Sequence, residues 1–371
     1  MKRLLALLLA MALVFTLAAC GTTEAPPAPV DEPGDEAAAV PTPEPADDAL
    51  RVDVFIYSFA DTFIATVRDA LANELGLAGM DFTLHDADND QATQVDQIRT
   101  AITMGTDLLM VNIVSTGAED VAMNIVDMAR DADVPVIFFN REVSDDVINS
   151  FDKAVYVGTD AAEAGFMQGE LIFNMISQNI DQFDLNDDGE ISYIMFKGEL
   201  GNPEAQGRTE FSVYQANLLL EAADLPLLTF YDPQNTDLFI GANWSAAEAQ
   251  SAMLTALTTN PMTGDNPIEL VIANNDDMAL GAIEALNGIG FNTGEGDFIP
   301  VFGVDATDVA RDAISTGRMT GTIEQSATGM AQALVILALN VQNGVDLMEG
   351  TDGMNIDAGV AKIRIPHGMV F

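Results

Sequence analysis

The chain has a single cysteine, Cys20, among its 371 residues, so no disulfide can form within it. It has only two histidines, and no Cys or His residues stand at the spacing of a zinc site. The sequence also lacks a Ser-His-Asp order and a glycine-rich phosphate loop. It therefore carries no motif for a zinc enzyme, a triad hydrolase or a phosphate-loop enzyme.

Basic residues are scarce as well. Lys and Arg number 14 against 58 Asp and Glu, which gives a formal net charge of −44. Such a field repels nucleic acids and anionic lipid headgroups, so DNA binding and a membrane-surface role are disfavoured. The cause of the acidity stays open between metal sites, solvation, ancestry and a saline habitat.

The N-terminus predicts export. Lys2 and Arg3 precede an apolar run from Leu4 to Leu17, and residues 1–20 therefore have the pattern of a signal peptide. Cys20 directly follows Leu-Ala-Ala, which resembles the lipobox of bacterial lipoproteins, where that cysteine is lipidated. Residues 21–49 are Pro-rich and acidic and predict a disordered tether. We expect a protein anchored by lipid alone to the extracytoplasmic face of the membrane, at a cell surface or in a periplasm.

The remaining chain of about 320 residues exceeds the usual single core, so two domains are expected. Short apolar runs alternate with stretches of helical spacing along its whole length, which predicts βαβ units and parallel sheets. The fold class is therefore α/β, with two doubly wound lobes in series. Strands are expected at 52–57, 81–85, 108–113, 134–139, 191–196, 227–230, 270–273 and 299–304. The helices of the second half are expected at 161–178, 203–222, 245–258, 276–287, 307–316 and 328–343.

An acidic loop, residues 184–192, follows the pattern of an EF-hand calcium loop through its first nine positions. Gly189 holds the turn position, but Met195 stands where the bidentate Glu of position 12 belongs, and a thioether is no ligand for calcium. The segment after the loop has the pattern of a strand. The loop is therefore either a structural metal site completed by a distant carboxylate, or an acidic turn without metal.

Polar and aromatic residues stand where the predicted strands end. Ligands bind at the carboxyl ends of strands in doubly wound lobes, and planar Asp, Asn and Arg groups can pair with vicinal hydroxyls. Phe63 and Trp244 are candidate walls for the apolar faces of a sugar. Two alternatives remain: these polar residues are helix N-caps, as Asp276 is expected to be, and the aromatic residues belong to the core.

From about Arg51 onward the chain resembles the galactose/glucose-binding proteins, which are the receptors of hexose ABC transporters. The shared stretches are 89–91, 138–140, 156–160, 184–186, 271–276 and 301–305. This resemblance implies the type I periplasmic binding protein fold, with two lobes joined by a three-segment hinge. The N-terminal lobe is expected at 50–134 plus 325–364, and the C-terminal lobe, with the calcium loop, at 135–324 plus 365–371.

The same resemblance implies site residues. Hydrogen bonds to the sugar are expected from Asp61, Asn112, Arg208, Asn275 and Asp305, and stacking from Phe63 and Trp244. Asn202, Glu204 and Gln325 stand where the family has His, Asp and Asn, so the identity of the sugar is open. The structural calcium would be held by Asp184, Asn186, Asp188, Glu190 through its carbonyl, Ser192 and Glu269.

Two functions from different classes remain. The first is a monomeric receptor that binds a monosaccharide, glucose or galactose, by hinge closure and delivers it to an ABC permease. A chemoreceptor as a further partner is left open. The second is a secreted glycan hydrolase with two catalytic carboxylates among the many acidic residues. A sugar-responsive repressor is disfavoured, because a signal and tether stand where a DNA-binding domain would be needed.

Overall fold

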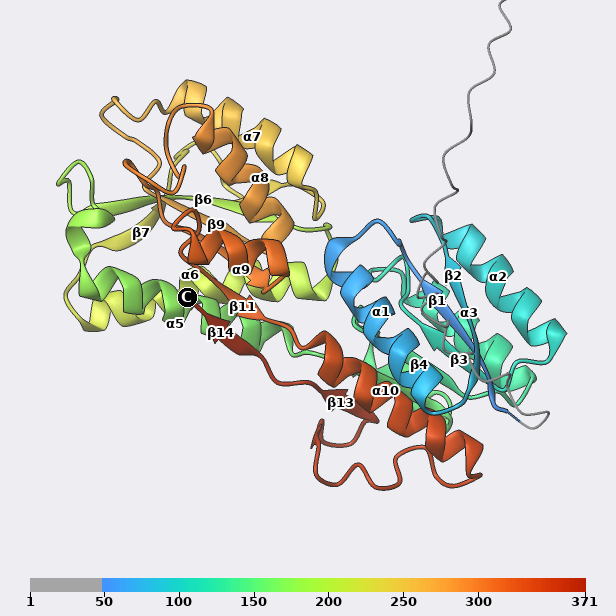
Figure 1. Cartoon of the computed structure of the whole chain (residues 1–371). Helices are drawn as coiled ribbons and strands as arrows, with labels where there is room; N and C mark the ends of the chain where they lie inside the picture. The colour runs from blue at the N-terminus through green and yellow to red at the C-terminus, as the bar shows by residue number, and fades with distance from the viewer. Residues whose placement is uncertain (1–48) are drawn as a thin grey trace, which may run out of the picture. The chain divides into compact units, whose positions relative to one another are not determined.

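The structure is a computed structural model that describes residues 49–371. The predicted signal peptide, Cys20 and all but the last residue of the tether lie outside the described residues. Within 49–371, no helix has both the length and the apolar character needed to cross a bilayer. The described chain forms two α/β lobes, as the sequence predicts (Figure 1).

The sheet of the first lobe has, within the described residues, seven strands in the order β12-β13-β5-β4-β3-β1-β2. Its central strands are buried along their whole length, as expected of a parallel sheet covered on both faces. The edge strand β12 is antiparallel to its neighbour. The bounds are β1 Arg51–Ile56, β2 Asp81–Asp86, β3 Leu108–Val111, β4 Val136–Phe139, β5 Ala154–Gly158, β12 Asn355–Ile356 and β13 Lys362–Arg364.

Helices cover both faces of this sheet. On one face, α1 (Thr62–Leu77) and α10 (Ala327–Gln342) share a core cluster. These two helices come from opposite ends of the chain and lie side by side, α1 in blue and α10 in red in Figure 1. On the other face, a separate cluster includes residues of α2 (Gln91–Met104), α3 (Glu119–Asp131) and α4 (Asp145–Asn149).

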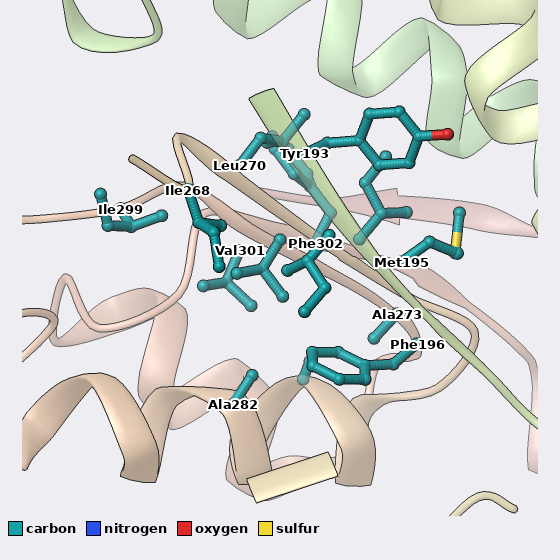
Figure 2. Packing of buried hydrophobic residues seen from close by; sticks show 14 of the residues in the cluster. Tyr193, Met195, Phe196, Ile268, Leu270, Ala273, Ala282, Ile299, Val301 and Phe302 are labelled. Carbon is teal, nitrogen blue, oxygen red and sulfur yellow. The ribbon is translucent and has the colours of Figure 1, made fainter. Parts of the chain in front are cut away.

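The second lobe has a sheet in the order β14-β11-β10-β9-β6-β7, with the short β8 paired to β6. Figure 2 shows its core, where side chains of β6, β9 and β10 pack together with Ala282 of α8. The strands are β6 Glu190–Lys197, β7 Leu227–Phe230, β8 Ile240–Gly241, β9 Leu270–Ala273, β10 Val301–Asp305, β11 Gly321–Glu324 and β14 Gly368–Val370. The helices are α5 Ala161–Gln178, η1 Ile180–Gln182, α6 Pro203–Ala222, α7 Ala246–Thr259, α8 Asp276–Asn287 and α9 Asp308–Ser315.

The described chain passes between the lobes at three places, which together form the hinge. The first crossing segment, 159–160, joins β5 to α5; the second, 325–326, joins β11 to α10; the third, 365–367, joins β13 to β14. The predicted boundary at residues 134 and 135 is wrong, because β4 and β5 pair with β3 in the first sheet. The first lobe therefore continues through β5 to the first crossing segment.

Helices α5 and α6 pack closely because glycines face the contact. A Cβ added to Gly169 of α5 would lie 2.5 Å from the carbonyl oxygen of Ser212. Gly76 of α1 is the opposite case, since its added Cβ would meet no atom within 4 Å. The close approach of the α5 and α6 backbones therefore depends on the absence of a side chain at Gly169.

We expect Gly169→Ala to lower the free energy of unfolding by about 1–3 kcal/mol, since the added methyl group overpacks a rigid contact. The matched variant Gly76→Ala should raise it by roughly 0.5–1 kcal/mol, because alanine suits a helix better than glycine does. Urea denaturation measures both changes. Equal effects of the two variants would contradict the close packing of α5 on α6.

Candidate functional site

A cavity of about 50 Å³ lies between the lobes and is lined by side chains from both of them. Nine of the ten predicted sugar-binding residues are among those that line it. The lining residues are Tyr57, Asp61, Phe63, Ile64, Asn140, Arg141, Asn202, Glu204, Arg208, Trp244, Asn275, Asp305 and Gln325.

These residues meet because they follow the carboxyl ends of parallel strands. Tyr57 follows β1, Asn140 and Arg141 follow β4, Gln325 follows β11, and Asp305 is the last residue of β10. The carboxyl ends of the two sheets face the same cavity, as expected for doubly wound lobes.

Three of the polar lining residues are also helix N-caps. Asp61, Asn202 and Asn275 accept hydrogen bonds from backbone amides in the first turns of α1, α6 and α8. One residue can therefore be both a helix cap and a site residue, because each of these side chains has a second polar atom besides the one that accepts the helix amide. Asp61 uses its second oxygen to accept the hydroxyl of Tyr57, at 2.5 Å. Capping fixes these side chains in orientation, and three helix N-termini point their partial positive charge towards the cavity.

Arg208 and Asp305 form the charged centre of the second lobe's side of the cavity. Their closest atoms are 3.8 Å apart, and both side chains are buried. Nη1 of Arg208 donates to the carbonyl of Asn274 at 2.9 Å, and Gln325 donates to Asp305 at 2.5 Å. Burial raises the pKa of Asp305 despite the nearby guanidinium. This arrangement holds the two planar groups rigidly.

Glu204 is the second buried carboxyl group of the cavity. Its Oε1 accepts the backbone N–H of Glu142 from the first lobe at 3.0 Å. Its Oε2 is buried and has no hydrogen-bond partner among residues 49–371. Burial raises the pKa of Glu204. A buried acceptor without a partner is costly, so Oε2 is suited to receive a donor from a ligand.

Three aromatic side chains border the cavity. Phe63 belongs to the core of the first lobe and lines the cavity as well. Trp244 lies against Gly198, where an added Cβ would overlap the indole ring, and the guanidinium of Arg208 is 5.7 Å from the ring centroid. Arg141 stacks over Tyr57 at 4.1 Å. The cavity therefore combines flat polar groups with apolar walls.

Three of the lining residues have a left-handed backbone conformation. Asn140, Trp244 and Asp305 have φ values of 59°, 65° and 120°. Positive φ is uncommon outside glycine and is an outlier for a bulky residue such as tryptophan. Strained residues cluster at functional sites, where surrounding contacts hold them in place.

Asn112 is the one predicted sugar-binding residue that is not among those lining the cavity. Its side chain is fully buried behind the cavity, where Nδ2 donates to Oδ1 of Asn140 at 3.2 Å and Oδ1 accepts the amide of Tyr57. Asn140 lines the cavity in its place. Asn140 could have been found from the sequence, because it ends a predicted strand and belongs to a stretch quoted for the resemblance. Tyr57, Ile64 and Arg141 were also missed, although Tyr57 directly follows the first strand.

The expected cap role of Asp276 is wrong. Asn275 caps α8, whereas the carboxyl of Asp276 accepts Thr307 through its amide at 2.8 Å and Thr322 through its hydroxyl at 2.6 Å. Asp276 is completely buried, and burial raises its pKa to about 7. Asp276 therefore holds the backbone that follows Asp305 in place, and it does not line the cavity.

The predicted calcium loop, residues 184–192, turns sharply at its glycine and is contacted by a distant carboxyl group. Gly189 has φ of 84°, as the sharp turn at position 6 requires. Glu269 reaches the loop from the residue before β9, and its two oxygens accept the amides of Leu185 and Ser192 at 2.7 Å each.

The donor set of this loop consists of hard oxygens, which fits calcium. Burial raises the pKa of Glu269, and the negative charges of Asp184 and Asp188 raise it further. The hydroxyl of Ser192 is buried without a partner in the described chain. Within residues 49–371, however, no three His, Cys, Asp or Glu side chains are grouped closely enough to hold a metal by themselves, so amide, hydroxyl and carbonyl oxygens would have to take part.

Comparison with known proteins adds to this geometry. A family model described as periplasmic binding protein domain matches residues 52–346. The chain is 34% identical over 319 residues to the D-galactose/methyl-galactoside binding periplasmic protein of Haemophilus influenzae, a match that covers 85% of this chain and 88% of that protein.

Solved structures are similar as well. An ABC transporter solute binding protein of Bacillus halodurans with bound myo-inositol has a TM-score of 0.66 and 27% identity, covering 87% of this chain and 95% of that one. A periplasmic solute binding protein of Actinobacillus succinogenes with bound D-allose has a TM-score of 0.68 over 86% of this chain and 97% of that one. At 17% identity the second likeness concerns the fold alone.

We expect Asp276→Asn to flatten the pH dependence of stability. Because the folded pKa is raised from 3.8 to about 7, the contribution of Asp276 is complete below pH 4 and is lost as the pH rises through 7. Three pKa units correspond to about 4 kcal/mol. Urea denaturation between pH 5 and pH 8 measures the slope. The control is Asp308→Asn, at an exposed position of α9, and a slope unchanged by Asp276→Asn alone would refute the buried carboxyl's role.

Proposed function

This chain belongs to the periplasmic binding protein family, and we propose that it binds a monosaccharide, glucose or galactose, and delivers it to an ABC permease. Members of the family are binding proteins of transporters and not enzymes, which removes the hydrolase alternative. The observation that carries the proposal is the cavity between the lobes, where Asp61, Arg208 and Asp305 offer flat polar groups beside aromatic walls. The similarity to a galactose-binding protein supports this choice of sugar.

Closure of the hinge is the mechanism we propose. The lobes already touch at the rim of the cavity, where Thr62 donates to Asp277 at 2.8 Å and Arg141 pairs with Glu199. A sugar that contacts both lobes has a higher affinity for the closed form than for the open one, so it shifts the population towards closure. The permease then recognises the closed form.

The lobes hold complementary groups for hydroxyls. Each hydroxyl can donate and accept at once. Carboxyl oxygens of Asp61, Glu204 and Asp305 accept, while Asn140 and Arg208 donate. Asn202, Glu204 and Gln325 differ from the family's residues in reach, so the choice between epimers depends on them.

We further propose that the protein is held on the extracytoplasmic side of the membrane by lipid on Cys20. The support is the sequence of residues 1–20, where a charged end, an apolar run and Leu-Ala-Ala precede the cysteine. The acidic, Pro-rich stretch that follows would place the binding lobes away from the bilayer.

A structural calcium in the loop of residues 184–192 is the last part of the proposal. Asp184, Asn186, Asp188, Ser192 and Glu269, with the carbonyl of Glu190, would hold it. A calcium ion would supply positive charge to Asp184 and Asp188, whose negative charges raise the pKa of Glu269, and it would have no part in binding the sugar. The oxygen donors and the turn at Gly189 support calcium over a transition metal.

Isothermal titration with D-glucose, D-galactose, D-ribose and myo-inositol tests the function. We expect stoichiometric binding of one hexose, and Trp244→Ala should weaken it by about 2 kcal/mol, which is roughly thirtyfold, because a buried aromatic wall is lost. Tyr214→Ala, at a residue of α6 that is 57% exposed, is the matched control and should leave the affinity unchanged. Absence of heat with every sugar would refute the proposed function.

Chelation tests the calcium site. We expect EGTA to lower the melting temperature of the wild type, since an ion at one hundred times its dissociation constant stabilises by about 2.7 kcal/mol. Asp188→Asn should abolish this response, while Asp187→Asn, at the exposed neighbouring position, should keep it. A wild-type melting temperature that is the same with calcium and with EGTA would eliminate the metal.

A further inference from the structure

Glu142 lies next to the cavity but does not line it. It follows Asn140 and Arg141, which do, in the loop after β4. Its backbone N–H donates across the lobes to Oε1 of Glu204 at 3.0 Å. The main chain of Glu142 is therefore a direct link between the first lobe and a carboxyl group of the second.

The side chain of Glu142 points to two cations on β13, which are the first and last residues of that strand. Oε1 accepts Nζ of Lys362 at 2.7 Å and Nη2 of Arg364 at 2.7 Å, and Oε2 accepts Nη1 of Arg364 at 2.9 Å. The side chains are 16%, 3% and 12% exposed for Glu142, Lys362 and Arg364. Paired contacts between arginine and a carboxylate fix orientation as well as distance. These three residues are called the Glu142 clamp.

Hydrogen bonds and the chain itself connect the Glu142 clamp to all three crossing segments of the hinge. Arg364 directly precedes the third segment, and its Nη1 also donates to the carbonyl of Thr159 in the first, at 2.9 Å. The hydroxyl of Thr159 donates to Gln325 in the second segment, at 3.1 Å, and Gln325 donates to Asp305. Contiguous hydrogen bonds therefore run from Glu204 through the clamp to the hinge and back to the cavity.

The geometry makes Glu204 dependent on this connection. Glu204 is buried, and its Oε2 faces no partner within residues 49–371, so the amide of Glu142 is what holds its carboxyl group from the first lobe. If the loop at Glu142 shifts, Oε1 loses its cross-lobe donor and Oε2 loses its orientation towards the cavity. A hydrogen bond weakens steeply when its angle leaves the favourable range, so a displaced Glu204 would bind a ligand less well.

We propose that Glu142 is a positioning residue for the ligand: its clamped side chain fixes the amide that orients Glu204, and it stabilises the closed form through the hinge. This inference rests on the proposed sugar-binding function. It assigns a role in affinity to a residue that does not line the cavity.

Glu142→Gln tests the clamp, because it keeps the shape and the backbone amide but removes the charge that holds Lys362 and Arg364. The variant should fold, since Lys362 keeps Asp145 and Arg364 keeps Asp357, each at 2.7 Å. Asp145→Asn is the matched control: its carboxyl is 65% exposed and also pairs with Lys362, but it does not contact Arg364 or Glu204 among the described residues.

The readouts are the dissociation constant by calorimetry and the two rate constants by stopped-flow fluorescence of Trp244, with the hexose that the wild type binds. We expect Glu142→Gln to weaken binding roughly tenfold, almost wholly through faster dissociation, and Asp145→Asn to change it less than twofold. Arg364→Lys, which keeps the charge but loses the paired contact, should give an intermediate loss. Equal affinities of Glu142→Gln and Asp145→Asn would overturn the proposal.

Amide hydrogen exchange without sugar separates this proposal from the proposed function. The clamp predicts faster exchange in the loop 140–143 of Glu142→Gln than in the wild type and in Asp145→Asn. If the wild type binds no sugar but this difference is found, the proposed function fails and the role in affinity fails with it, while the hold of the clamp on the loop 140–143 stands. If the wild type binds a hexose and exchange in that loop is the same in all three proteins, the clamp fails alone.

Discussion

Burial of charged and amide side chains between two lobes is the constraint on which the structure depends. Such groups are tolerated only with partners, and here the protein itself supplies partners. Asp61, Asn202 and Asn275 each satisfy a helix N-terminus, and Arg208 is held by Asp305 and a backbone carbonyl. The groups are thus oriented before a ligand arrives, which reduces the entropy that binding must overcome.

The path of the chain decides how these groups can move. Because the chain crosses between lobes at three places, each lobe is completed by segments that return late in the sequence, as α10 and β13 complete the first and β14 completes the second. Each lobe has its own core, so each can rotate as a rigid body while a few residues of the crossing segments change their dihedral angles. The hydrogen bonds of Thr159, Gln325 and Arg364 lie at these residues, which places the hinge in direct contact with the site.

Much of the fold and most of the site could be predicted from the sequence. The alternation of apolar runs and helical stretches predicted the two α/β lobes, and nine of ten residues expected at the site line one cavity. The errors have physical reasons. The boundary at residue 134 was misplaced because a strand's periodicity does not tell which sheet it joins. Asn112 and Asn140 both follow buried strands, and only packing turns one towards the cavity and the other behind it.

The sequence by itself determined the elements, the export signal pattern and the chemistry of the candidate residues, because periodicity and side-chain type are local properties. It also predicted that a metal in the acidic loop would need a carboxylate from outside the loop, and Glu269 does reach the loop. Only the tertiary structure decided which strand ends face one another, which oxygen of Glu204 is free, and that Glu142 is tied to the hinge. These features arise from contacts between residues far apart in the chain, whose geometry is set by the packing of whole lobes and not by any neighbour in the sequence.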